Sequence, residues 1–117
     1  MIIQSIELKN FRNYRELKLE FDENTNIFYG DNAQGKTNIL EAVYLSGTTK
    51  SHKGSRDRDM LFFGEEEGHL RTFVKKGEMD YRIDIHLKKN RTKGIAVNGI
   101  PIKKAGELFG IANFVFF

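Results

Sequence analysis

The stretch from Gly30 to Thr37 reads Gly-Asp-Asn-Ala-Gln-Gly-Lys-Thr and is the most informative part of this 117-residue chain. It matches the pattern Gly-x-x-x-x-Gly-Lys-Thr, in which backbone N–H groups turn inward and cradle phosphate oxygens. An apolar, β-prone run precedes it at residues 27–29, and apolar residues at helical spacing follow from Ile39 to Leu45. This order predicts a strand, a phosphate-binding loop and a helix.

Each position of the motif has its own chemical role. Gly30 and Gly35 allow backbone angles that a side chain would forbid, and they let a phosphate approach closely. The first turn of the following helix offers unpaired N–H groups and a partial positive charge. Lys36 can reach the β- and γ-phosphates, and the hydroxyl of Thr37 can bind Mg²⁺. The motif therefore predicts nucleotide phosphate binding, against the alternative of a glycine-bearing turn that only joins a strand to a helix.

Composition indicates a globular protein of one domain. Hydrophobic residues make up 39% of the chain and charged residues 30%, which argues against wholesale disorder. The absence of cysteine excludes a disulfide framework and agrees with a reducing cytoplasm. No signal peptide and no apolar run of membrane-spanning length is present, so no membrane partner is expected. The net charge of +3 permits a nucleic-acid partner without demanding one.

Strand patterns fill most of the remaining sequence. Apolar and polar residues alternate over several short runs, and Asn98-Gly99 is a strong signal for a two-residue hairpin turn. The helix after the motif is expected to end near Ser46-Gly47. The expected fold class is α/β: half of a phosphate-loop NTPase core with an antiparallel β layer. The predicted strands are residues 2–8, 17–21, 27–29, 69–75, 81–87, 95–97 and 100–102, with a short helix at 103–109.

Two basic segments are candidate binding surfaces. The first lies in an aperiodic polar stretch at residues 48–59, where basic side chains could hold nucleic-acid phosphates or could belong to a solvated loop. The second, residues 88–93, is rich in lysine at a turn between strands, and lysines in such turns more often serve to keep the protein soluble. The candidate DNA-binding residues of the first segment are Lys50, Lys53, Arg56 and Arg58.

Other chemistry is not indicated by the sequence. His52 and His86 are isolated in the sequence and His69 begins a predicted strand. No two histidines, and no histidine with paired carboxylates, have metal-ligand spacing, so no metal site is predicted. Hydrolysis by phosphate-loop enzymes needs a carboxylate on a neighbouring strand. Asp84 lies inside an alternating strand rather than at a strand tip, which places that carboxylate outside this chain. The aromatic residues, Phe28, Phe62, Phe63 and Phe73 among them, are expected in the core.

Three motifs together resemble the N-terminal part of the bacterial RecF family. They are the run from Leu8 to Tyr14 (Leu-Lys-Asn-Phe-Arg-Asn-Tyr), the phosphate loop extended through Asn38, and Leu40-Glu41-Ala42. Ser51-His52-Lys53, followed by Asp59 and Gly64, is similar to a stretch of that family in which arginine is commoner than lysine at the third position. Leu-x-Asn-Phe-Arg and the phosphate loop are shared with SMC, Rad50 and ABC-type ATPases. The added Asn-Tyr and the Ser-His-Lys element narrow the resemblance to RecF, and it covers essentially the whole chain.

The resemblance implies a DNA-binding ATPase of recombinational repair and the damage (SOS) response, cytoplasmic and nucleoid-associated. Such a protein acts with RecO and RecR at gaps, single-strand/double-strand junctions and stalled forks, and binds double-stranded DNA. It implies ATP and Mg²⁺ as cofactors and hydrolysis only by a full-length, ATP-dependent homodimer. By position it also places Arg12 near the nucleotide. The implied nucleotide-binding residues are Gly30, Asp31, Asn32, Ala33, Gln34, Gly35, Lys36, Thr37, Asn38 and Arg12, with Thr37 also binding Mg²⁺.

The apolar run at residues 111–117, which has no polar cap, favours a fragment of a longer protein. Residues 1–117 are accordingly expected to be the N-terminal part of an ABC-type ATPase head, binding nucleotide weakly and inactive alone without the signature and Walker B elements. A small-molecule kinase with the same loop is an alternative, although kinases usually open directly with the loop strand and two strands come first here. A β-rich interaction module with a vestigial loop is the other alternative.

Overall fold

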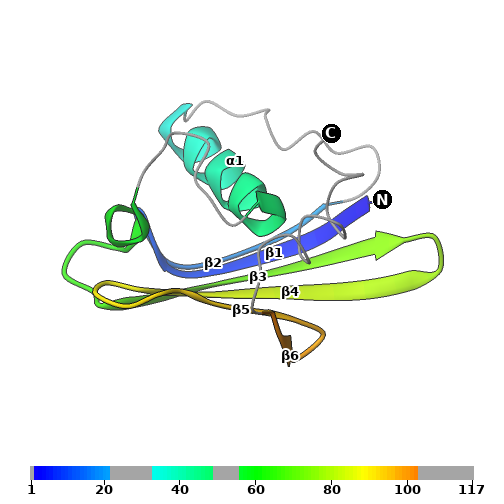
Figure 1. Cartoon of the computed structure of the whole chain (residues 1–117). Coiled ribbons are helices and arrows are strands. Elements are labelled where there is room, and N and C mark those ends of the chain that lie inside the picture. Colours follow the sequence, from blue (N-terminus) through cyan, green and yellow to red (C-terminus); the bar gives the residue numbers. More distant parts are fainter. Residues whose placement is uncertain (1, 22–32, 49–55, 103–117) are drawn as a thin grey trace.

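One antiparallel sheet with a helix across one face makes up the described part of the chain (Figure 1). The computed structural model describes residues 2–21, 33–48 and 56–102. Six strands in these ranges pair in the order β2-β1-β3-β4-β5-β6. The elements in chain order are β1 (Ile2–Phe11), β2 (Tyr14–Glu20), α1 (Ala33–Thr48), the 3₁₀ helix η1 (Asp57–Met60), β3 (Glu67–Lys76), β4 (Met79–Lys88), β5 (Gly94–Val97) and β6 (Ile100–Pro101).

The first hairpin, β1–β2, follows the predicted alternation. Ile6 and Leu8 are buried under the helix, whereas Glu7 and Lys9 point to the other face. On β2, Leu17 and Leu19 are half-buried, as expected for an edge strand. Both predicted strands are therefore confirmed, with β1 extending three residues further than expected. The strand predicted at 27–29 and the helix predicted at 103–109 lie outside the described residues.

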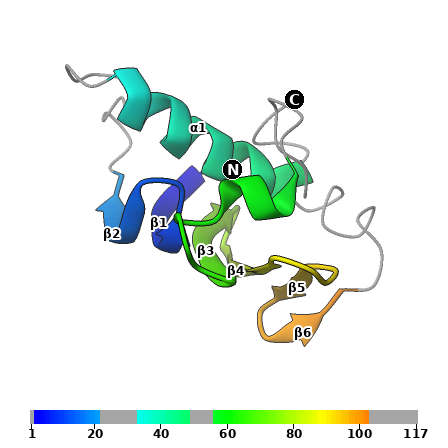
Figure 2. The same cartoon turned by 90° about the vertical axis from the view of Figure 1, so that its left-hand side faces the viewer.

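The second half of the sheet also confirms its sequence pattern. Ile83, Ile85 and Leu87 are buried on β4, and the residues between them are half-buried. The β5–β6 hairpin turns at Asn98 and Gly99, whose φ angles of 52° and 81° are the positive pair that a type I′ turn requires. β5 and β6 lie farthest from α1 (Figure 2).

Helix α1 begins at Ala33, inside the Gly-x-x-x-x-Gly-Lys-Thr motif, and ends one residue beyond the predicted stop. Ala42, Val43 and Leu45 are buried against the sheet. A polar contact lies within this interface: the Ser46 hydroxyl is 2.7 Å from the Thr72 hydroxyl on β3, and both side chains are buried. An apolar stripe and a hydroxyl pair thus both contribute to holding α1 on the sheet.

The outer face of the sheet, opposite α1, carries charges of alternating sign. Glu7 pairs in register with Lys18 on one side and with Arg71 on the other, and Arg71 pairs with Asp84. The Arg71 Nε donates to Asp84 Oδ1 at 2.7 Å, and this bond raises the pKa of Arg71. Cross-strand pairs of opposite charge stabilise a sheet, so this face is built for contact with water.

Two expectations about loops are wrong. Residues 57–60 form a 3₁₀ turn where an aperiodic loop was predicted, and Met60 at its end is completely buried. Phe63, expected in the core, is 95% exposed. Phe62 is half-buried under the guanidinium of Arg15, 4.3 Å from the ring centre. No helix in the described ranges combines the length and apolar character needed to cross a bilayer.

The close packing of Gly68 on β3 against β1 leads to a prediction about stability. A Cβ atom at this position would lie 2.7 Å from the Asn10 carbonyl oxygen and 2.9 Å from Leu61 Cδ2. Gly68→Ala is therefore expected to lower the free energy of unfolding by about 2 kcal/mol, measured by urea denaturation. Gly94→Ala is the matched control, because its Cβ would meet only His86 Cβ at 3.8 Å. Equal stability of the two variants would contradict this packing.

Candidate nucleotide site

The second half of the phosphate-loop motif forms the start of α1. Residues 33–37 have helical backbone, which places their amide groups at the helix N-terminus. The first N–H groups of a helix have no partner within it and carry the positive end of the helix dipole. The backbone from Ala33 onward therefore has the geometry that an anion requires. Gly30, Asp31 and Asn32 lie outside the described residues, as do the side chains of residues 33–37.

Arg12 fixes the β1–β2 turn against α1. Its Nε donates to Glu41 Oε1 at 2.7 Å and its Nη2 to Glu41 Oε2 at 2.8 Å, a two-pronged ion pair. The Glu41 side chain is fully buried, whereas that of Arg12 is 22% exposed. The hydrogen bond to Glu41 is the main cause of the raised pKa of Arg12. Because both carboxylate oxygens accept a bond, the charge on the helix is neutralised inside the protein.

The same arginine also reaches η1. Its Nη1 donates to the Asp59 carbonyl oxygen at 2.9 Å, and its backbone N–H donates to the Met60 carbonyl oxygen at 2.8 Å. Arg12 has a φ of 52°, in the left-handed region that costs energy for a residue other than glycine. One strained residue thus connects the first hairpin, the helix after the motif and the 3₁₀ turn.

Asn38 is the one predicted nucleotide-binding residue of the motif whose side chain the structure describes. It is 98% buried, and its Nδ2 donates to Asn13 Oδ1 in the β1–β2 turn at 2.8 Å. Its own Oδ1 is buried and has no hydrogen-bond partner in the described part of the chain. A buried acceptor without a partner is costly in a folded protein, and a donor supplied by a ligand would satisfy it.

An open groove of about 910 Å³ runs beside Asn38, and we call it the Asn38 groove. Arg12, Asn13 and Asn38 line one part of it, and the loop after η1 lines another. The structure therefore brings Arg12 and Asn38 to one groove at the N-terminal half of α1. Its remaining lining residues are Arg58, Asp59, Leu61, Phe62, Phe63, Gly64, Glu65 and Lys89.

Only two of the predicted DNA-binding residues are described. Arg56 and Arg58 are exposed beside η1, and Lys50 and Lys53 lie outside the described residues. Arg56 faces Asp59 at 3.8 Å, with both side chains largely in water. The second basic segment, predicted to serve solubility at a separate turn, lies against the first and shares a groove with it. No local sequence pattern indicates this proximity, because it depends on the order of the strands in the sheet.

His69 and His86 contradict the prediction of isolated histidines. They face each other across β3 and β4 with ring centres 4.2 Å apart, and His86 Nε2 lies 3.1 Å from Glu67 Oε1. Partial burial, and next the charge of His86, lower the pKa of His69. Within residues 2–21, 33–48 and 56–102, no three acidic or histidine side chains come together as a metal-binding group.

Comparison with known proteins connects this geometry to an ATPase family. A family model described as an AAA ATPase domain matches residues 1–106. The DNA replication and repair protein RecF of Agathobacter rectalis is 68% identical over 117 residues, that of Lachnospira eligens 66% and that of Lachnoclostridium phytofermentans 62%. Each match covers the whole of this chain, which spans 32% of the length of these relatives.

Solved structures agree with the sequence matches. The chain superposes on a RecF–ATP structure of the RecFOR pathway with a TM-score of 0.84 and 39% identity, covering 93% of this chain and 30% of that one. It superposes on the SMC head domain from Thermotoga maritima with a TM-score of 0.72 and 18% identity, covering 95% of this chain and 42% of the other. The second likeness supports the fold alone.

The Arg12–Glu41 pair predicts a large stability difference between two arginines of the same hairpin. Arg12→Ala leaves a buried carboxylate without its main partner and is expected to lower the free energy of unfolding by about 3 kcal/mol. Arg15→Ala removes an exposed pair with Glu65 at 3.1 Å and is expected to cost about 1 kcal/mol or less. Chemical denaturation of both variants measures the difference. Similar losses would mean that burial does not govern the strength of these pairs.

The lowered pKa of His69 predicts a pH dependence of stability. As the pH falls below 6.5, the ordinary value, the unfolded chain takes up a proton that folded His69 resists, so folding becomes less favourable. Its charged neighbours Lys9 and Arg71 act in the same direction, and Glu67 opposes them. Between pH 8 and about pH 5, the melting temperature of His69→Gln is expected to fall less than that of the unaltered chain. Identical pH profiles would contradict this prediction.

Proposed function

We propose that this chain, which belongs to the AAA ATPase domain family, forms the ATP-binding half-site of a RecF-like DNA repair ATPase. The observation that carries the proposal is the position of α1, which begins inside the phosphate-loop motif and is locked to the first hairpin through Arg12 and Glu41. The superposition on a RecF–ATP structure at 39% identity supports it. Residues 1–117 would then form part of an ABC-type head domain.

The residues fit an ATP phosphate group. Gly30, Asp31, Asn32, Ala33, Gln34 and Gly35 would supply backbone N–H groups, and Lys36 would neutralise the β- and γ-phosphates. Mg²⁺ would bind the Thr37 hydroxyl and supply further charge neutralisation. Asn38 offers its unpartnered Oδ1, which an N–H or O–H donor of the ligand or its hydration shell would satisfy.

Arg12 would act near the nucleotide as a positioning residue. All three of its guanidinium nitrogens donate to Glu41 or to the Asp59 carbonyl, so its charge is already committed to the protein. Its contribution to nucleotide binding would be to hold the start of α1 and the β1–β2 turn at a fixed distance. This role differs from the direct contact that the family resemblance implied for this position, and the hydrogen bonds favour it.

ATP turnover by the 117-residue chain alone is not proposed. In its described part, Asp84 is the strand carboxylate that the sequence analysis considered for hydrolysis. It is bonded to Arg71 and Arg82 on the outer face of the sheet. A P-loop enzyme needs a carboxylate beside the phosphate loop. The motif continues into α1, on the other face of the sheet from Asp84. We propose weak nucleotide binding without hydrolysis, and hydrolysis by an ATP-dependent dimer of a longer RecF-like chain.

The proposed cellular role follows from the relatives. The names of these relatives place them in DNA replication and repair, and the solved RecF structure belongs to the RecFOR pathway. We propose that a longer protein containing this chain acts in the cytoplasm with the nucleoid, binds DNA at gaps and junctions, and functions with RecO and RecR. Arg56 and Arg58, with Lys50 and Lys53, would contribute to the DNA-facing surface.

The alternatives from the sequence have less support. A small-molecule kinase would usually open with the strand of the phosphate loop, whereas the β1–β2 hairpin precedes it here. An interaction module with a vestigial loop would need no helix N-terminus positioned by a buried ion pair.

Lys36→Ala tests the proposed function directly. Loss of a charge-assisted hydrogen bond to phosphate is expected to weaken binding of Mg–ATP about tenfold or more, measured by isothermal titration calorimetry. Lys75→Ala is the control, because Lys75 is an exposed lysine at the far end of β3. Unchanged affinity in Lys36→Ala would favour the interaction module, and steady ATP turnover by the 117-residue chain would contradict the half-site.

A further inference from the structure

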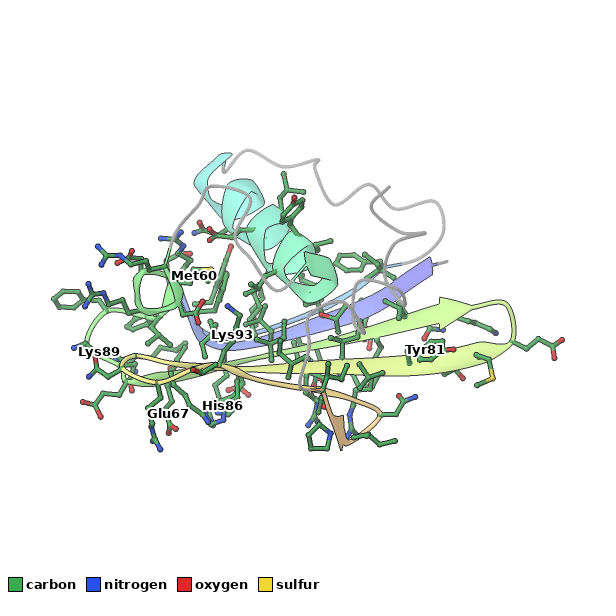
Figure 3. All side chains as sticks on the ribbon, viewed as in Figure 1. Met60, Glu67, Tyr81, His86, Lys89 and Lys93 are labelled. Atoms are coloured by element: carbon green, nitrogen blue, oxygen red, sulfur yellow. The ribbon has the colours of Figure 1, made fainter. Side chains whose placement is uncertain are left out.

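Two basic segments that are far apart in sequence meet at one end of the sheet. Residues 56–58, at the start of η1, and residues 88–92, at the turn from β4 to β5, line a shared open groove of about 550 Å³. Lys89 and Met60 of η1 lie at one end of the sheet, and Tyr81 lies toward the other end (Figure 3). We call this the basic groove and define it by its five cations: Arg56, Arg58, Lys88, Lys89 and Arg91.

Arg56 of this groove lies 3.8 Å from Asp59, but most of the groove's positive charge is uncompensated among the described residues. Its one lining carboxylate, Asp57, is already paired with Lys93 at 2.9 Å, and both side chains are mostly buried. Arg58, Lys89 and Arg91 are exposed and make no ion pair within the described part of the chain. The whole chain has a net charge of only +3, so these cations are a local concentration rather than a general excess. Such a concentration attracts polyanions.

An exposed aromatic ring lies beside the same cations. Phe63 lines the Asn38 groove together with Arg58 and Lys89, which also line the basic groove, so the two grooves are neighbours. With 95% of its surface in water, Phe63 is the most exposed of the large hydrophobic residues in the described ranges. A solvated aromatic face next to a basic groove is the arrangement that proteins use to stack an unpaired base above a bound backbone.

We propose that the basic groove binds the phosphate backbone of a single-stranded nucleic acid and that Phe63 stacks one of its bases. The inference rests on the proposed DNA-linked function and extends it by naming a surface, a strand type and residues from the turn between β4 and β5. A phosphodiester chain supplies both a row of negative charges and π-faces. An acidic peptide or an anionic membrane supplies charge alone and leaves Phe63 unexplained.

A charge-neutralising pair of substitutions tests the groove. The probe is oligothymidylate of about 16 nucleotides, and its affinity is measured by fluorescence anisotropy over a range of salt concentrations. Arg58→Gln combined with Lys89→Gln is expected to flatten the slope of log K against log[salt] by about 1.4, since two phosphate contacts are lost. Lys18→Gln combined with Lys75→Gln removes the same charge from exposed sites elsewhere and is expected to leave the slope unchanged. Equal slopes in both double variants would overturn the assignment of phosphate binding to the basic groove.

Phe63→Leu tests the stacking separately from the charge. Because the ring is exposed, the fold is expected to persist, as checked by circular dichroism. Affinity for oligothymidylate is expected to fall about tenfold, while affinity for a duplex of the same length stays within about twofold. Equal loss for both probes, or no loss for either, would overturn the assignment of a single strand. Poly-glutamate or anionic vesicles that bind as tightly as oligothymidylate would overturn the nucleic-acid assignment.

Failure here is distinguishable from failure of the proposed ATP site. Titration of the unaltered chain with Mg–ATP reports on the phosphate loop, and titration with oligothymidylate reports on the basic groove. Nucleotide binding without oligothymidylate binding overturns only the basic groove.

Discussion

The buried carboxylate of Glu41 is the constraint on which the rest of the site depends. Removing an ion from water costs several kcal/mol, and only close, well-oriented partners offset that cost. Arg12 is such a partner, but only if the β1–β2 turn adopts a left-handed backbone and lies directly against α1. The pair therefore excludes other placements of the helix on the sheet. It fixes the position of α1, which includes residues 33–37 of the motif.

Local physics made much of this fold predictable. The alternation of Ile83, Ile85 and Leu87 is a property of β4 alone, and Asn98-Gly99 specifies the turn between β5 and β6. The helix after the phosphate loop needed only apolar spacing and the absence of a breaker. These features are decided by neighbours in sequence, so the chain alone was sufficient to predict them. The position of Arg12 near the motif needed the family resemblance as well.

Features that depend on pairing between distant segments were missed. The contact between His69 and His86 was not predicted. A two-residue turn that starts at Gly77 pairs Lys76 with Met79, and the same hairpin register then pairs His69 with His86. The contact between the two basic segments depends on η1 packing beside the β4–β5 turn, which no local pattern encodes. Phe63 was assigned to the core from residue type alone, and residue type says little about a ring on a surface loop.

The pairing of β1 with β3 has a consequence for the order of folding. Both hairpins can form from residues close in sequence, but Leu8 reaches Leu70 only after the chain between them has been closed into one large loop that contains the phosphate loop and α1. Long-range closure of this kind costs entropy before any contact repays it, and it slows folding. During synthesis one edge of β1 therefore stays unpaired until β3 has been made, although α1, which comes earlier in the chain, can already cover the apolar face of the hairpin.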